Sequence, residues 1–285
     1  MRNNSYLFVP GNEKKKIMKA LDSKADVIII DLEDAVPPEE KESARLTISE
    51  VLNQYSKQRN VSIRINEVNS LHWQEDVRLL SLSNVDKLVV PKVEEARDLI
   101  VIDEYLHSVD LKNYKLIPII ESAKGVMNLS PILQASRNIE RLAFGSLDYL
   151  ENIDGKLTED EHALLFAKAM ILNTSIAFGL ASPIDCPYFD TGNTEGFKKN
   201  VLQNLNLGFK AKLLIHPNQI ELLHEVIKPS ESEVNEALEI IRLYEEAVSL
   251  NKGAFKYKGR MIDLPVYLSA QNTLLKANIT EVINI

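Results

Sequence analysis

Cysteine and long apolar runs are scarce in this sequence of 285 residues, and its 33 lysine and arginine residues are outnumbered by 41 acids. The single cysteine, Cys186, has no partner for an internal disulfide, which is typical of a reducing compartment. No stretch is long enough to cross a bilayer, and the opening MRNNSYLF lacks the apolar centre of a signal peptide. A formal charge of −8 disfavours nucleic acid and anionic membranes as partners. We therefore expect a cytoplasmic protein that acts on small molecules.

Glycine is missing where a dinucleotide-binding fold would need it. The first candidate turn reads PGNEKK and lacks the G-x-G-x-x-G spacing, so a doubly wound open sheet is the less favoured architecture. Hydrophobic residues make up 45% of the chain, which is enough for a sizeable core. Eight short apolar runs are typical of strands buried on both faces. They span residues 7–11, 27–34, 61–66, 87–93, 115–122, 141–149, 182–188 and 211–217.

Segments with helical periodicity and little glycine or proline separate these runs. They span residues 13–23, 38–55, 73–82, 94–107, 124–134, 159–178 and 194–205. Eight strands that alternate with helices predict an α/β protein, a (β/α)8 TIM barrel, over residues 1–230. Residues 231–285 exceed what closure of the barrel requires and contain a charged helix, a turn at 257–259 and a second helical stretch. We expect this helical extension to pack on the barrel and on a neighbouring subunit.

Polar side chains stand where the strand-like runs end. The clearest case is DVIIIDLEDAV, residues 26–36, in which a β-branched run leads directly into three acids. The carboxyl ends of barrel strands meet at one face, where ligands bind, so these side chains are expected to form an acid-rich mouth with isolated cations. The set comprises Asp31, Glu33, Asp34, Arg64, Asn66, Lys92, Glu121, Asp148, Asp185 and His216.

Clustered carboxylates without paired histidine or cysteine suit a hard cation that prefers oxygen ligands. Mg2+ is usually held by one or two acids, with the other positions left to water and substrate. Glu121 and Asp148 follow neighbouring strands and are the best ligand candidates. Either acid alone could equally cap the helix that follows it.

Four cationic residues have alternative interpretations. Arg64 suits a carboxylate or a developing oxyanion, or it forms a structural ion pair with the acids of residues 31–34. Lys92 is expected to stay charged rather than form a Schiff base, because acids surround it. Lys15 and Lys19 share one helical face and are candidates for binding phosphates, although a solvated charged face is the simpler interpretation of each lysine.

Several motifs occur in a characteristic order along nearly the whole chain. They are LFVPGNEKK, DLEDAV, RIN, PKVE, IIES, F-G-x-x-D and GRMIDLP. Together they resemble the citrate lyase β-subunit group of the HpcH/HpaI aldolase superfamily. The opening PGNEKKK and the tail 251–273 are most similar to members of that group that cleave citramalyl-CoA.

The resemblance implies a Mg2+-dependent carbon–carbon lyase that splits a 3-hydroxyacyl-CoA thioester into acetyl-CoA and a 2-oxoacid. It implies that Glu121 and Asp148 bind Mg2+ and that Arg64 contacts the reacting thioester. Phe8, Lys15 and Lys19 are expected along the path of coenzyme A, and Glu33 and Asp34 around the metal ligands. Asp263 is implied as the acid–base residue, supplied to a neighbour's active site in a homotrimer.

Two positions depart from the pattern of the group. Similar proteins commonly carry Arg before the Ser of the first strand, whereas this chain has Asn4 there. Similar proteins usually carry Glu immediately before the metal-binding Asp, whereas this chain has Leu147 there. The acyl group of the substrate is therefore left open among the citramalyl, citryl and malyl types. A thioesterase that acts on the same CoA esters and a non-catalytic subunit that binds them are the alternatives.

Overall fold

The computed structural model describes residues 4–55, 59–82, 85–250, 253–277 and 279. Two compact units, Met1–Leu223 and His224–Ile285, make up the chain. Among the described residues, none of the helices combines the length and the apolar character that a membrane crossing requires.

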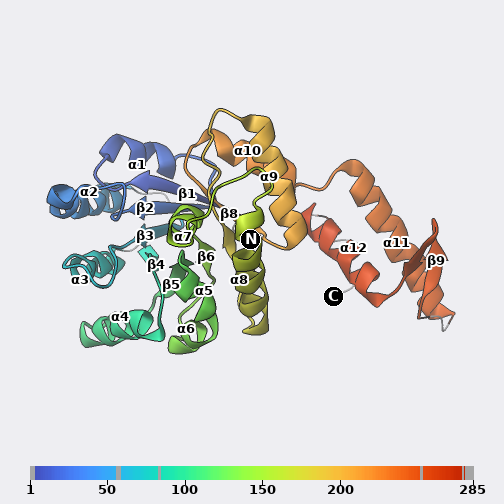
Figure 1. The fold of residues 1–285 in the computed structure, drawn as a ribbon. Coiled ribbons are helices and arrows are strands. Elements are labelled where there is room, and N and C mark those ends of the chain that lie inside the picture. The colour runs from blue at the N-terminus through green and yellow to red at the C-terminus, as the bar shows by residue number, and fades with distance from the viewer. Residues whose placement is uncertain (1–3, 56–58, 83–84, 251–252, 278, 280–285) are drawn as a thin grey trace. The chain divides into compact units, whose positions relative to one another are not determined.

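The first unit is built on a closed barrel of eight parallel strands in sequential order (Figure 1). The predicted α/β barrel is thus confirmed. The strands are β1 Ser5–Pro10, β2 Val27–Asp31, β3 Val61–Arg64, β4 Val85–Val90, β5 Lys115–Ile120, β6 Ala143–Phe144, β7 Ile184–Asp185 and β8 Ala211–Leu214.

Helices follow the strands and cover the outside of the barrel. The α-helices are α1 Lys14–Leu21, α2 Lys41–Gln54, α3 Trp73–Val77, α4 Ala96–Ser108, α5 Ala123–Met127, α6 Leu129–Ala135, α7 Ser146–Asn152, α8 Leu165–Ala177, α9 Thr194–Leu207 and α10 Asn218–Ile227. Short 3-10 turns, η1 Pro38–Glu40, η2 Arg78–Ser81 and η3 His162–Leu164, precede α2, follow α3 and precede α8.

Strand β2 shows why an unbroken apolar run forms a barrel strand. Side chains alternate between the two faces of a strand, and Val27 and Ile29 join the cluster in the barrel interior. Ile28 and Ile30 face the other way and are also fully buried, because the helices cover that face. Both faces therefore need apolar residues, and only the end of the strand is free to carry acids.

The sequence-based prediction was wrong in extent for three segments. One is the strand expected over residues 182–188, where β7 covers only Ile184–Asp185. Residues 141–149 were expected to form a strand, but β6 is only two residues long and α7 begins at Ser146. The stretch AFGSLDYLEN contains no β-branched residue that would favour a longer strand. The helix expected over residues 124–134 is split into α5 and α6 at Asn128, whose side-chain amide donates to the carbonyl oxygen of Glu94.

The second unit contains α11 Glu231–Ser249, β9 Phe255–Tyr257, β10 Arg260–Ile262 and α12 Leu264–Lys276. The two strands form an antiparallel hairpin, and the left-handed backbone of Lys258 and Gly259 makes the turn expected at 257–259. An apolar cluster that includes Ile241, Ile262 and Leu274 holds these elements together. The proposed division at residue 230 and the packing on a neighbour stay predictions.

Candidate active site

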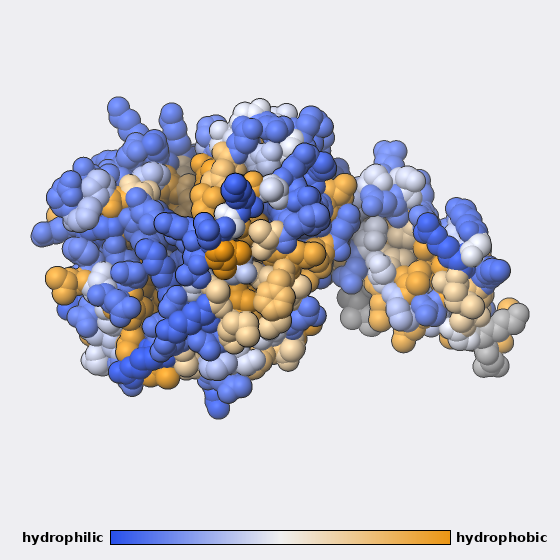
Figure 2. Space-filling model, viewed as in Figure 1, coloured by the Kyte–Doolittle hydropathy of each residue, from blue (hydrophilic) through white to orange (hydrophobic). Residues whose placement is uncertain are grey.

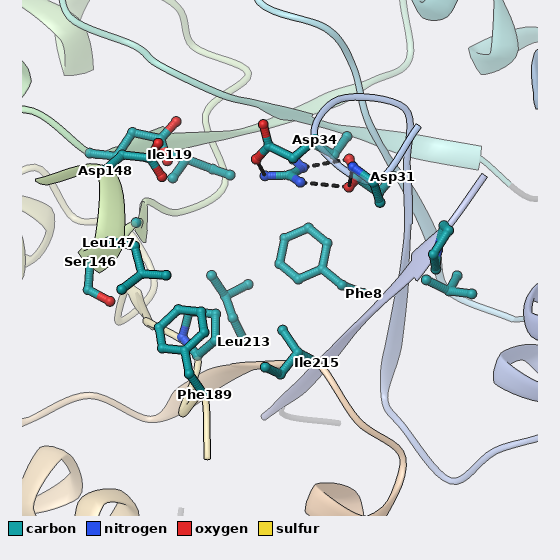
Figure 3. A pocket seen from close by; sticks show the side chains of 17 residues that line it. Phe8, Asp31, Asp34, Ile119, Ser146, Leu147, Asp148, Phe189, Leu213 and Ile215 are labelled. Carbon is teal, nitrogen blue, oxygen red and sulfur yellow. Dashed lines mark hydrogen bonds and ion pairs between the residues drawn. The ribbon is translucent and has the colours of Figure 1, made fainter. Parts of the chain in front are cut away.

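A cavity of about 390 Å³ lies at the carboxyl ends of the barrel strands (Figure 3). Its walls come from the ends of β1, β2, β3, β5 and β8 and from the segments after β6 and β7. The lining residues are Phe8, Val9, Pro10, Asp31, Asp34, Ala35, Arg64, Ile119, Glu121, Gly145, Ser146, Leu147, Asp148, Pro187, Phe189, Leu213 and Ile215. Six predicted site residues, namely Phe8, Asp31, Asp34, Arg64, Glu121 and Asp148, thus share one cavity.

Arg64 is the cation at the centre of the polar wall. Its guanidinium donates two parallel hydrogen bonds of 2.6 Å to the carboxylate of Asp31. It also forms ion pairs with Glu33 at 3.0 Å and Asp34 at 3.2 Å, and it lies 4.9 Å from the ring centre of Phe8. Burial opposes the charge, but these three carboxylates raise the pKa of Arg64 above its ordinary value. The structural ion pair is therefore present, and it holds Arg64 charged and oriented at the cavity.

The loop after β2 is held from beneath by Lys41. This buried lysine donates hydrogen bonds to the backbone carbonyls of Leu32 and Glu33. The carboxylate of Asp31 in turn accepts hydrogen bonds from the backbone N–H groups of Glu33 and Ala35. These contacts fix the carboxylates that orient Arg64. Burial raises the pKa of Glu33 to about 7.

Glu121 follows β5 and is only 6% exposed. One carboxylate oxygen accepts a 2.6 Å hydrogen bond from the backbone N–H of Lys92, whose left-handed φ of 52° is uncommon outside glycine. Burial and the neighbouring charges of Glu33 and Asp148 raise the pKa of Glu121 to about 8. Gly145 permits this arrangement, because a Cβ there would lie 2.3 Å from the other carboxylate oxygen.

The residues at this wall fit a magnesium ion. Asp148 is exposed in the first turn of α7, and its charge reaches Glu121, so a cation between the two would relieve their repulsion. No group of three or more His, Cys, Asp or Glu side chains in the described part of the chain could hold a metal. Two carboxylates agree with the usual binding of Mg2+, which keeps several positions for water and substrate. The ligand roles of Glu121 and Asp148 stay predictions.

The other predicted site residues lie outside the cavity lining. Glu33 reaches the site through its ion pair with Arg64. Lys15 and Lys19 are exposed on α1 and form no ion pair with any described residue, unlike Lys14 and Lys16. Asp263 belongs to the second unit, where it caps the start of α12 by accepting a hydrogen bond from the backbone N–H of Val266.

Lys92 behaves as predicted, whereas His216, which was expected at the mouth, does not line the cavity. The Lys92 ammonium lies 3.1 Å from Glu33, and although burial opposes its charge, the acids around it raise its pKa above the ordinary value. Lys92 therefore stays charged. His216 is hydrogen-bonded through Nδ1 to the side chain of Asn218, at 2.6 Å.

Asp185 does not belong to the mouth, contrary to the prediction. Because Ile184 joins the interior cluster, the next side chain on β7 faces the surrounding helices. There Asp185 is 1% exposed and pairs with Lys168 of α8 at 2.9 Å and Lys212 of β8 at 2.5 Å. Its role is to tie strands to helices.

The apolar wall of the cavity was missed by the sequence analysis. Leu147, Phe189, Leu213 and Ile215 lie on one side of the view in Figure 3, and Asp31, Asp34 and Asp148 lie on the other, with the ring of Phe8 between them. Only Leu147 had been noticed, as a departure from a pattern. The others come from two separate places in the sequence, the segment after β7 and the end of β8, and carry no local signal of a binding site.

Comparisons with known proteins identify the family of the chain. A model of the HpcH/HpaI aldolase/citrate lyase family matches residues 4–217. The citrate lyase subunit beta of Haemophilus influenzae is 33% identical over 280 residues, which cover 96% of this chain and 96% of that protein. The mitochondrial citramalyl-CoA lyase of Rattus norvegicus is 32% identical over 290 residues, which cover 96% of this chain and 85% of that protein.

A solved structure is similar over the whole fold. It is that of protein CitE from Mycobacterium tuberculosis in complex with magnesium, acetoacetate and coenzyme A. The TM-score is 0.82 at 24% sequence identity, and the match covers 97% of this chain and 98% of that one. At this level of identity, the similarity establishes the fold alone.

Proposed function

The chain belongs to the HpcH/HpaI aldolase/citrate lyase family, and we propose that it is a Mg2+-dependent lyase that cleaves a carbon–carbon bond in a 3-hydroxyacyl-CoA thioester. The products are acetyl-CoA and a 2-oxoacid. Citramalyl-CoA, citryl-CoA and malyl-CoA are all members of this substrate class, because each has a hydroxyl and a carboxylate on the carbon at which the bond breaks.

One observation carries the proposal: the cavity brings Arg64, Glu121 and Asp148 together at the face where barrel enzymes bind substrates. Breaking the bond beside the thioester leaves an enolate, whose negative charge needs a preorganised cation. Arg64 has that charge, and its carboxylate partners hold it in a fixed orientation. The guanidinium has five N–H donors, so it can still donate one to the thioester oxygen.

The proton transfers complete the reaction. A base removes the proton of the substrate hydroxyl, the carbon–carbon bond breaks, and its electron pair moves onto the thioester carbonyl as an enolate. An acid then protonates the enolate carbon to give acetyl-CoA. We assign the second step to Asp263, supplied by a neighbouring subunit.

Glu121 and Asp148 would hold the magnesium ion. When bound, Mg2+ supplies positive charge to the hydroxyl and carboxylate of the substrate, which lowers the hydroxyl pKa and orients the bond that breaks. Glu121 keeps one carboxylate oxygen turned to Gly145 while Lys92 holds the other. Glu33 and Asp34 keep Arg64 in place beside this pair.

The coenzyme A portion is assigned to Phe8 and the exposed face of α1. Lys14 and Lys16 are occupied by ion pairs with glutamates. Lys15 and Lys19 are one helical turn apart, exposed, and unpaired among the described residues, so both can bind phosphate groups.

The surface of α8 supports a homo-oligomer, which we propose to be a trimer. Leu165, Phe166 and Ile176 are each more than half exposed, and orange side chains gather over this helix (Figure 2). Its single charged residue, Lys168, is buried. Large apolar side chains that are exposed together on one helix are normally covered, and a second copy of the chain is the cover that a homo-oligomer provides.

Product analysis tests the function. The purified protein is incubated with citramalyl-CoA, with and without Mg2+, and acetyl-CoA, pyruvate and free CoA are quantified. We expect acetyl-CoA and pyruvate in equal amounts, and only with Mg2+. Free CoA with intact citramalate would instead show a thioesterase. Loss of both products in Glu121→Ala would tie the reaction to the predicted metal ligand.

A further inference from the structure

The cavity has two chemically different walls, and this difference bears on the substituent that the substrate carries. The polar wall contains four carboxylates, those of Asp31, Asp34, Glu121 and Asp148, and one guanidinium, that of Arg64. Arg64 is the only positively charged residue among the described residues that line the cavity. The lining therefore carries an excess of negative charge.

The positive charge of Arg64 is already balanced by carboxylates of the protein, so it attracts a second acidic group of the substrate only weakly. Its guanidinium group forms ion pairs with Asp31, Glu33 and Asp34, and its side chain is only 12% exposed. Lys92, the next cation, pairs with Glu33 and does not line the cavity. A second carboxylate on the substrate would lose water and meet fixed negative charges, which is costly without a partner.

The opposite wall is apolar apart from the hydroxyl of Ser146, which lies beside Leu147 (Figure 3). Leu147 comes from α7, Phe189 from the segment after β7, and Leu213 and Ile215 from β8 and its end. Leu213 also belongs to the packed barrel interior, so this side of the wall is rigid. Leu147 is 46% exposed, so a ligand that covers it removes apolar surface from water.

We propose that the substrate carries an alkyl group, methyl or larger, on the carbinol carbon, and that Leu147 is a specificity-determining residue for it. This inference rests on the proposed function and names the substrate within that class. The corresponding 2-oxoacid product is pyruvate or a longer 2-oxoalkanoate. The cavity volume of about 390 Å³ leaves room for more than a methyl group.

Binding of the 2-oxoacid products tests the inference without depending on turnover. Glyoxylate, pyruvate, 2-oxobutyrate and oxaloacetate are titrated calorimetrically into the protein in the presence of Mg2+. We expect affinity to rise about fourfold for each added methyl or methylene, in the order glyoxylate, pyruvate, 2-oxobutyrate. Oxaloacetate should bind at least about tenfold more weakly than pyruvate, because its second carboxylate is unpaired.

A matched pair of variants assigns the effect to one residue. Leu147→Asn keeps the shape of the side chain but removes its apolar character, and it should reduce the preference for 2-oxobutyrate over glyoxylate about fourfold. Leu157→Asn makes the same change at a leucine that is 48% exposed and outside the cavity lining, and it should keep the ranking. Oxaloacetate binding as tightly as pyruvate, or an unchanged ranking in Leu147→Asn, would overturn the inference.

The two proposals fail in different ways. If none of the three CoA thioesters yields acetyl-CoA with Mg2+ but the affinity ranking holds, the lyase function is wrong and the alkyl site stands. If acetyl-CoA forms but citryl-CoA has a kcat/KM equal to or above that of citramalyl-CoA, the lyase stands and the alkyl site is wrong.

Discussion

The position of the Glu121 carboxylate depends on Gly145, the residue that faces it. The buried carboxylate touches the position where any side chain at residue 145 would begin. Glycine is therefore required at residue 145 because there is no space for a Cβ. The backbone itself would accept another residue, since the φ of Gly145 is negative. Such close approach is one of the reasons for glycine next to an active site.

Gly145→Ala should weaken Mg2+ binding about tenfold or more, because displaced ligands and their supports typically change metal affinity by that amount. The added Cβ would lie 2.3 Å from Glu121, so the carboxylate must move. Calorimetric titration with Mg2+ measures the change. Gly192→Ala is the matched control, since its nearest neighbour would lie at an ordinary 3.6 Å. Equal affinities in the two variants would show that Glu121 does not bind the metal.

At the scale of elements, a buried ionic cluster joins β7 and β8 to the helices outside them. Lys168 of α8 bridges Asp185 and Glu161, and Lys212 of β8 binds Asp185 and the side chain of Asn200 in α9. The two lysines and two acids balance in charge. Removing one charge from such a cluster leaves another buried without a partner.

Asp185→Asn should lower the free energy of unfolding by roughly 3–5 kcal/mol, because the buried ammonium group of Lys212 then loses its carboxylate partner. Urea unfolding measures the loss. Glu159→Gln, which breaks an exposed ion pair with Lys199, should cost far less because exposed charges stay hydrated. Similar midpoints for these two variants would contradict a structural role for the cluster.

The same cluster predicts a pH dependence. Burial alone would raise the pKa of Asp185, but Lys212 and Lys168 hold it below the ordinary value. Its contribution to stability is therefore complete above the pKa of an unfolded aspartate, about 3.9. It is lost as the pH falls from there through the lower folded pKa. Unfolding of Asp185→Asn should show a weaker dependence in that range.

Asp263 is the N-cap residue of α12, and its predicted catalytic role can be separated from this capping role. Asn caps a helix about as well as Asp, so Asp263→Asn should keep the stability of the helix but remove the acid. We expect turnover to fall about 10²- to 10⁴-fold with Mg2+ binding intact. Steady-state kinetics and a Mg2+ titration measure the two effects. Unchanged turnover would exclude Asp263 from catalysis.

At the scale of the whole molecule, the proposal that Asp263 acts on a neighbour has a direct test. Asp263→Asn and Glu121→Ala are each expected to be inactive alone. Mixed trimers made by unfolding and refolding the two together should regain about a quarter of wild-type activity, because in a cyclic assembly that fraction of sites combines two intact residues. Absence of recovery in trimers confirmed by light scattering would place both residues in one subunit.

The sequence by itself determined the barrel and the location of the site. The run from Val27 to Ile30 needs burial on both faces, and a strand of this kind can carry acids only where it ends. Repetition of that pattern eight times places Asp31, Arg64 and Glu121 at one face without any knowledge of distances.

Only the tertiary structure decided which strand-end residues face the cavity. Asp185 and Glu121 both follow apolar runs, but Asp185 is one position past an inward residue and so points to the helices. Side chains alternate with a period of two, and the sequence does not show the phase in which a short strand joins the barrel. The apolar wall likewise arises where Leu147, Phe189 and Ile215 meet, and closure of the barrel alone brings them together.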